Sequence, residues 1–442
     1  MAASPSKKLT SFQIVILGFA GIILAGTVLL MLPISTLDRH VTSLTDAAFT
    51  ATSATCVTGL IVHDTATTWS AFGQAVIILM IQMGGLGVVM ASATFALASG
   101  RRITLRERSM LKETFAAPKM EGMARMAVFI LKVTFITELI GALAMMPTFC
   151  AEHGLRGVWM AVFESISAFC NAGFDIMGTP GNTYTSLCGY ATNPVITGAI
   201  SLLIILGGIG FVTWNDILSN GRRVKRYSMQ SKVILVTTAV LIVAPALFFY
   251  LFEYGNLPSG ERTIAALFQS VTTRTAGFNV QDLSKMSEPG QALTILLMLI
   301  GGSPGSTAGG IKTTTLAVLA ANFGAVCIRK EETNAFGRRI EDDIVKQASA
   351  IFMLYIGLAL LGAVAICLIE GIPYLTCLFE CASAIGTVGL TMGITPSLGM
   401  VSRIILMLYM FIGRVGGLTI IYAATKERRS VSKLPHESIT VG

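Results

Sequence analysis

The chain has 442 residues, of which 53% are hydrophobic and 13% are charged, about half of the charged fraction in an ordinary soluble domain. This composition excludes a soluble globular protein, and 44 glycines together with 21 methionines are typical of a polytopic α-helical membrane protein. The net charge of +8 comes from basic residues beside the apolar runs, which indicates membrane topology and contact with lipid headgroups and excludes a nucleic-acid surface.

Eight apolar runs are long enough to cross about 30 Å of hydrocarbon. Lysine and arginine accumulate after the second, fourth, sixth and eighth runs, whereas the other loops hold fewer basic residues alongside acids. The positive-inside rule therefore predicts a multi-pass protein of the cell membrane (the plasma or inner membrane) with both termini in the cytoplasm. The predicted spans are residues 14–33, 72–98, 126–149, 194–218, 233–252, 292–328, 344–369 and 400–424.

Between the two runs of each successive pair lies a shorter, half-apolar segment that ends in glycine followed by Leu or Phe. These segments read FTATSATCVTGL, FESISAFCNAGF, LFQSVTTRTAGF and FECASAIGTVGL. Their glycines recur at intervals of about 110 residues, and a near-constant period over the whole chain indicates duplication. We therefore predict four repeats of span, re-entrant segment and span, at residues 1–100, 101–220, 221–330 and 331–442, the last ending in a short cytoplasmic tail.

Irregular backbone at membrane depth must be buried in protein or line a water-filled cavity. Four re-entrant segments therefore predict an all-α integral membrane protein with eight transmembrane helices and four pore helices around one pseudo-fourfold ion pore. Glycine lets the backbone bring carbonyl oxygens close to the axis, and rings of carbonyls replace the hydration shell of K⁺. The candidate K⁺ selectivity filter consists of Thr55, Cys56, Val57, Thr58, Gly59, Phe169, Cys170, Asn171, Ala172, Gly173, Thr273, Arg274, Thr275, Ala276, Gly277, Ile385, Gly386, Thr387, Val388 and Gly389.

The segments share little besides glycine and a small residue or Val before it, which indicates that backbone oxygens bind the ion. The cysteines and histidines lack the spacing of metal ligands. K⁺ at the filter is therefore the only metal ion predicted, and no organic cofactor is expected.

On SATCVTGL, SAFCNAGF, VTTRTAGFN and SAIGTVGLTMG the chain resembles the Trk/Ktr/HKT superfamily of K⁺ transporters, and in particular the bacterial potassium-translocating subunits of the KtrB type. The resemblance extends over essentially the whole chain. It implies a K⁺ uptake subunit that is not an enzyme, and a homodimer seated on a cytoplasmic nucleotide-binding ring of the KtrA type. Na⁺ dependence, as in symport, stays open. A Na⁺-permeable HKT-type transporter remains the alternative, although Gly59 stands where HKT transporters often carry serine.

The sixth run is interrupted by GGSPGSTAGG, residues 301–310, whose five glycines and one proline cannot remain in a regular α-helix. In the resembled family the corresponding loop lies beneath the filter and acts as a gate, and a basic residue at the position of Arg414 points into the pore nearby. The candidate gate consists of Ser303, Pro304, Gly305, Ser306, Thr307, Ala308, Gly309, Gly310, Lys312 and Arg414.

These charged residues also allow other interpretations. A phosphate-binding loop fails on spacing, because Ile311 separates the last glycine from Lys312, and a membrane enzyme that uses this lysine lacks acids or histidines beside it. For Arg414, a structural ion pair between spans remains open. Arg274 is expected to brace its segment by pairing with an acid such as Glu164 or Glu380.

Overall fold

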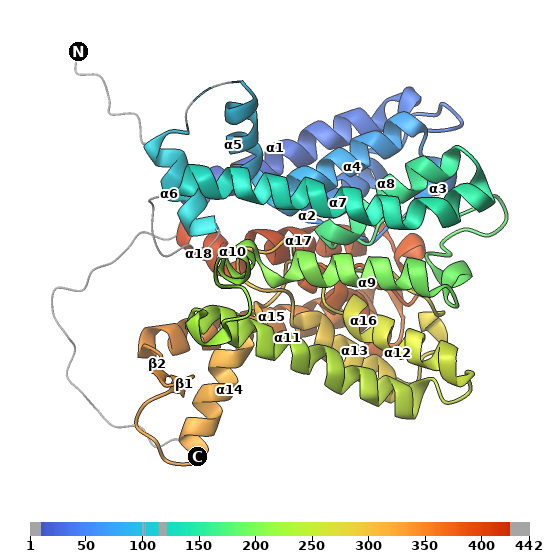
Figure 1. Ribbon diagram of the computed structural model, residues 1–442. Coiled ribbons are helices and arrows are strands. Elements are labelled where there is room, and N and C mark those ends of the chain that lie inside the picture. The colour runs from blue at the N-terminus through green and yellow to red at the C-terminus, as the bar shows by residue number, and fades with distance from the viewer. Residues whose placement is uncertain (1–9, 100, 102, 115–121, 425–442) are drawn as a thin grey trace.

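The computed structural model describes residues 10–99, 101, 103–114 and 122–424, and these residues are predominantly α-helical (Figure 1). The one sheet in the described part of the chain is a hairpin of two-residue strands, β1 (Asn334–Ala335) and β2 (Arg338–Arg339). The predicted all-α class is therefore confirmed.

Four units with the same order of elements follow one another along the chain. Each has a long helix, a short helix that leads into one of the glycine motifs, and a third helix. The first two units are α1 (Ser11–Met31), α2 (Leu44–Cys56) and α4 (Ala71–Leu86), then α7 (Met123–His153), α8 (Arg156–Cys170) and α9 (Pro194–Ile209). The last two are α11 (Met229–Phe248), α12 (Ser259–Thr272) and α13 (Glu288–Leu299), then α15 (Asp342–Glu370), α16 (Tyr374–Gly386) and α17 (Met400–Val415).

The third helix of each unit is shorter than the sequence predicted. The helices α1, α7 and α15, and α11 with the π-turn Phe249–Glu253 that continues it, are each long and apolar enough to span a membrane. By contrast, α4, α9 and α17 have 16 residues and α13 has 12. At 1.5 Å per residue, 16 residues reach about 24 Å, less than the hydrocarbon core. The runs predicted to span at residues 72–98, 194–218 and 400–424 are therefore each built of two helices.

Each of these three runs breaks at a glycine. Gly87, Gly210 and Gly416 have φ angles of +85°, +94° and +93°, a region that glycine enters without a Cβ clash. The helix direction changes by 102° into α5 (Val88–Ala98) and by 95° into α10 (Phe211–Asn220), and α18 (Gly417–Ala424) follows the third break. In the third unit, the predicted interruption is present, because the loop of residues 301–310 separates α13 from α14 (Thr313–Cys327).

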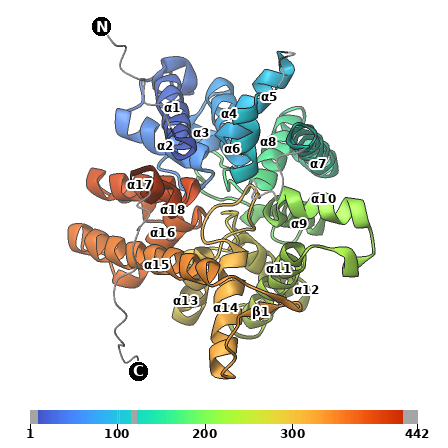
Figure 2. The ribbon, with the colours of Figure 1, turned by 90° about the vertical axis from the view of Figure 1, so that its left-hand side faces the viewer.

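The units close into a ring, which Figure 2 shows nearly end-on. Within a unit the first helix packs against the second, and the third helix packs against the second helix of the next unit. The contacting pairs between units are α4 with α8, α9 with α12, α13 with α16, and α17 with α2. Because the last pair joins the fourth unit back to the first, the ring has a central axis.

The remaining elements lie at the two ends of the ring (Figure 1). Helices α5, α6 (Leu105–Thr114), α10, α14 and the hairpin lie at one end, called here the α14 end. Helix α3 (Thr65–Thr68) lies at the other, called here the α3 end. Short 3₁₀ turns occur at Pro33–Ser35, Cys188–Tyr190, Val224–Arg226, Leu283–Lys285 and Thr395–Ser397.

Candidate ion pore

The four motif segments, residues 55–59, 169–173, 273–277 and 385–389, occupy the ends of α2, α8, α12 and α16 and have the same backbone shape. The residue two before each motif glycine is left-handed: Val57, Asn171, Thr275 and Thr387 have φ angles of +58°, +59°, +63° and +51°. Residues other than glycine rarely adopt positive φ. Four such residues at the same motif position indicate that the same backbone turn follows each of the four helices.

The motif glycines form a closed ring of contacts. Each has a positive φ, from +66° at Gly173 to +92° at Gly389. A Cβ on Gly59 would lie 2.5 Å from the carbonyl oxygen of Ala172, and one on Gly173 would lie 2.6 Å from that of Ala276. On Gly277 and Gly389 it would meet the carbonyl oxygens of Val388 and Thr58.

Each glycine therefore contacts the carbonyl of the residue that precedes the next glycine, and the cycle closes from the fourth segment to the first. Backbone oxygens from four segments meet around one centre, which is the arrangement that replaces an ion's hydration shell. The four helices also direct their C-terminal ends, which carry partial negative charge, toward this centre. Both features favour a cation there.

Hydroxyl groups one helical turn earlier hold the motif segments from behind. The Ser53 and Ser383 hydroxyls accept hydrogen bonds from the backbone N–H of Gly59 and Gly389, at 3.1 and 3.0 Å. In the other two segments, the Ser167 and Thr272 hydroxyls donate to the carbonyls of Phe174 and Phe278, at 2.6 and 2.5 Å. Sequence reasoning missed these hydroxyls, although three of them recur six residues before a motif glycine.

Two buried glutamates brace the chain that leaves the second and fourth motif segments. Glu164 accepts from the N–H of Ile176 at 3.0 Å, and Glu380 accepts from the N–H of Met392 at 2.9 Å. Neither pairs with Arg274, whose nearest polar partner is the Thr238 hydroxyl at 3.4 Å. The predicted pairing of Arg274 with Glu164 or Glu380 is therefore wrong: both carboxylates bond to the chain that follows their own pore helix, Glu380 also through the Thr391 and Thr395 hydroxyls.

Glycines in the third helices let those helices approach the motif segments closely. A Cβ on Gly84, Gly207 or Gly413 would collide with the carbonyl oxygen of Thr55, Phe169 or Ile385 respectively. Each contacted residue stands four before its motif glycine, and each of these helical glycines stands three before the glycine at the helix break. These glycines of α4, α9 and α17 therefore pack against the backbone of the candidate filter.

The glycine-rich loop of residues 301–310 reaches the centre of the ring. Its Ser303 and Thr307 N–H groups donate to the carbonyls of Gly208 and Gly207 in the second unit, at 3.0 and 3.2 Å. On the other side, a Cβ on Gly309 would collide with the Thr387 hydroxyl of the fourth unit. The loop thus lies between opposite units, on the α14 side of the motif segments.

Two cationic side chains hold this loop. Arg414 donates to the carbonyls of Thr307, Gly84 and Gly85, and Lys312 donates to the carbonyl of Ala308 at 2.8 Å. Both therefore use backbone oxygens as partners, and the interpretation of Arg414 as half of an ion pair between spans is not supported. The structure brings the predicted gate residues together, with Arg414 connecting the loop to the first and fourth units.

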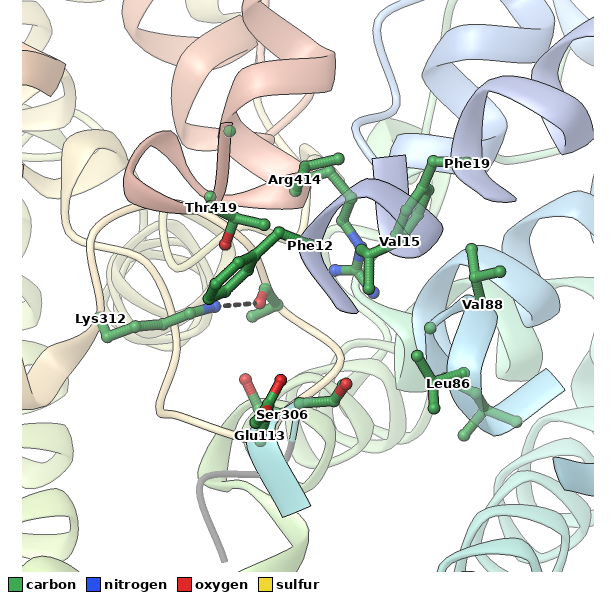
Figure 3. A pocket seen from close by; sticks show the side chains of 18 of the residues that line it. Phe12, Val15, Phe19, Leu86, Val88, Glu113, Ser306, Lys312, Arg414 and Thr419 are labelled. Carbon is green, nitrogen blue, oxygen red and sulfur yellow. Dashed lines mark hydrogen bonds between the residues drawn. The ribbon is translucent and has the colours of Figure 1, made fainter. Parts of the chain in front are cut away.

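A cavity of about 250 Å³ opens beside the loop toward the α14 end. Figure 3 shows Lys312 and Arg414 in its wall, with Phe12 between them and Ser306 near Glu113 of α6. The cavity is large enough for several water molecules. It therefore provides an aqueous space next to the loop.

Comparison with known proteins was made on the sequence and on the fold. Residues 3–433 match the family model described as TrkH, cation transport protein. The potassium/sodium uptake protein NtpJ of Enterococcus hirae is 39% identical over 99% of this chain and 98% of its own length. The Ktr system potassium uptake protein B of Bacillus subtilis is 38% identical over 98% and 97%. The potassium transporter TrkH from Vibrio parahaemolyticus superposes with a TM-score of 0.76 at 17% identity, covering 96% of this chain and 86% of that one.

By family, this helical membrane protein with four pore-loop units is therefore a cation transport protein. The chain belongs to the TrkH family, as the resemblance in its motifs predicted. This family consists of transporters and not of enzymes, so the interpretation of Lys312 as an enzymatic residue is set aside.

Proposed function

We propose that this chain is the ion-translocating subunit of a K⁺ uptake system and that the four motif segments are its selectivity filter. The observation that carries the proposal is the closed cycle in which each motif glycine contacts the carbonyl before the next. Relatives at 38–39% identity are named as potassium/sodium and potassium uptake proteins. Backbone carbonyls as the sole ligands suit K⁺, whose hydration shell they replace.

The glycine-rich loop, with Lys312 and Arg414, is the proposed gate. It lies on the axis between the motif segments and the cavity of the α14 end. Its backbone contacts the second and fourth units directly and is linked through Arg414 to the first. An ion that leaves the motif segments toward the cavity has to pass this loop. A fixed positive charge next to that path raises the barrier for a cation.

The proposed orientation places the α14 end in the cytoplasm and the α3 end outside. Support comes from the basic residues beside α6, α10, α14 and the hairpin and the positive-inside rule. Selective labelling of a cysteine at position 2 from one side of right-side-out vesicles tests it. Labelling from the outside would contradict the proposal.

For partners, we propose a homodimer that binds a separate cytoplasmic nucleotide-binding ring of the KtrA type. One relative belongs by name to a Ktr system, which implies several components. Light scattering of the purified protein should give the mass of a dimer, and co-purification with a KtrA-type subunit should depend on the α14 end. A monomer without affinity for such a subunit would refute this part.

The test of transport is rubidium uptake into proteoliposomes that contain the purified chain, with K⁺ or Na⁺ as competitor. K⁺ should suppress the uptake at concentrations at which Na⁺ has little effect. Equal suppression by Na⁺ would favour the second candidate, a Na⁺-permeable transporter. The Enterococcus hirae relative supports this candidate, because its name includes sodium as well as potassium uptake. A separate arm with Na⁺ at low concentration tests whether Na⁺ stimulates uptake. Absence of rubidium uptake would refute both candidates.

A further inference from the structure

One hydroxyl joins the proposed gate to the proposed filter. The Thr307 side chain in the glycine-rich loop is fully buried. Its Oγ1 lies 3.0 Å from the carbonyl oxygen of Phe169 and 3.1 Å from Oδ1 of Asn171. Both partners are acceptors and belong to the second motif segment, so the single hydroxyl proton is shared between them.

Asn171 extends this contact to a neighbouring segment. Its Nδ2 donates to the carbonyl of Arg274 in the third motif segment at 3.3 Å, and to that of Ile204 in α9 at 3.5 Å. Asn171 is 1% exposed and its amide is therefore held on both sides by protein. The position two before the motif glycine holds Val57, Thr275 and Thr387 in the other segments. At this position, a side-chain amide that bridges two segments is therefore found in the second motif segment and not in the other three.

Thr307 is also the point at which the loop is most firmly attached. Its N–H donates to the carbonyl of Gly207 at 3.2 Å, and its carbonyl accepts from Arg414. The backbone of Thr307 thus fixes the loop to α9 and α17, while its side chain fixes the second motif segment. If the loop moves aside, all of these hydrogen bonds break.

We propose that Thr307 couples the gate to the filter: its hydroxyl positions the Phe169 carbonyl and the Asn171 amide only while the loop lies across the axis. Displacement of the loop therefore relaxes the second and third motif segments, and K⁺ selectivity depends on the position of the gate. Thr307 acts through Asn171 and is a positioning residue. The inference rests on the proposed function of the loop and the motif segments.

The test replaces the hydroxyl by a methyl group of similar size. Thr307→Val should lower the preference for K⁺ over Na⁺ in rubidium uptake by about fivefold, the factor that corresponds to the net loss of one ordinary hydrogen bond. Thr307→Ser keeps the hydroxyl and should restore the preference. Thr314→Val makes the same exchange in α14, outside the loop and the motif segments. It is the matched control and should keep the preference for K⁺ over Na⁺. If Thr307→Val does not fold, Thr307→Cys, a weaker donor, takes its place with the same expected direction.

A double-variant cycle shows whether the effect passes through Asn171. Asn171→Gly removes the amide and tolerates the left-handed backbone of this position. In the Asn171→Gly background, Thr307→Val should change the ion preference by a smaller factor than it does in the original chain. Equal factors in the two backgrounds would mean that the residues act independently, and would overturn the coupling.

The outcomes separate the inference from the proposed function. If the original chain prefers K⁺ and Thr307→Val keeps that preference at an unchanged melting temperature, the coupling is wrong and the transport function stands. If Thr307→Val and Thr307→Ser lose the preference equally, the hydroxyl has no special role and the coupling is again wrong. If the original chain itself shows no rubidium uptake, the proposed function fails and the coupling fails with it.

Discussion

Glycine at position 59 is required by two separate physical constraints. Its φ angle of +91° disfavours any residue with a Cβ, and the space where a Cβ would stand is occupied by the Ala172 carbonyl of the next segment. Gly173, Gly277 and Gly389 face the same pair of constraints. The sequence could show that glycine recurs there, but only the structure shows that each glycine makes room for a neighbour's oxygen.

Replacement of Gly59 by serine should therefore displace a carbonyl of the second segment and weaken ion discrimination. A left-handed residue with a Cβ costs about 1–2 kcal/mol, so we expect the preference for K⁺ over Na⁺ to fall by about tenfold. The measurement is rubidium uptake with Na⁺ as competitor. Gly21→Ser in α1 is the matched control, since beyond its chain neighbours and the adjacent backbone of its own helix no described atom lies within 4 Å of its Cβ position. Equal preference in both variants would contradict the filter assignment.

At the α3 end, Asp46 in the first turn of α2 forms an ion pair that fixes the pore helix. Its Oδ1 lies 2.6 Å from Nη1 of Arg403 in the first turn of α17. Burial raises the pKa of Asp46, but hydrogen bonds from Ser43 and His63 and the positive charge of Arg403 outweigh it, so that pKa lies below its ordinary value of 3.8. A depressed carboxyl pKa stabilises the fold above the unfolded pKa, and the stability is lost as pH falls through the folded one.

Asp46→Asn should accordingly lower the melting temperature of the purified protein at pH 7, and this deficit should shrink at an acidic pH below the folded pKa of Asp46, which itself lies below 3.8. Asp343→Asn, whose carboxylate is largely exposed beside Lys346, serves as the control and should change little at either pH. If the melting temperature of Asp46→Asn is lowered by the same amount at both pH values, loss of the ion pair is not the cause of the lowering.

Among the elements, the break in the sixth run was predictable because five glycines and a proline within ten residues leave no other conformation. The breaks at Gly87, Gly210 and Gly416 were not, because glycines are frequent in membrane helices and even a cluster of them inside an apolar run is compatible with a continuous helix. What ends these helices is tertiary: glycines three residues earlier lie against carbonyls of the motif segments. A pattern of hydropathy carries no information on that contact.

The position of Arg414 makes the glycine-rich loop a testable element. Arg414→Gln removes a fixed positive charge beside the path and the hydrogen bonds through which Arg414 links Thr307 of the loop to Gly84 of α4. Both changes lower the barrier for a cation, so rubidium uptake should rise several-fold. Rubidium uptake should rise less in Arg414→Lys, which keeps the charge but not the planar set of guanidinium donors. Uptake that is unchanged or lower in a folded Arg414→Gln variant would contradict the gating role of the loop.

For the whole molecule, the fourfold repeat and the pore were predictable from the spacing of the motif glycines. The order of packing was not, because it depends on which third helix lies against which pore helix. The structure shows that every third helix packs on the pore helix of the following unit, ending with α17 on α2. Four units that each bury a face against the next are consistent with one cooperative ring.

The most direct measurement of the central claim is the anomalous scattering of crystals grown in rubidium salt. A peak is expected on the axis of the ring, between the carbonyl oxygens of Thr58, Ala172, Ala276 and Val388, and it should persist when Na⁺ is added in excess over rubidium. Displacement of the peak by Na⁺ at a concentration equal to that of rubidium would contradict selectivity at this site. An axis without rubidium, in crystals of protein that transports it, would contradict the carbonyl ring as the filter.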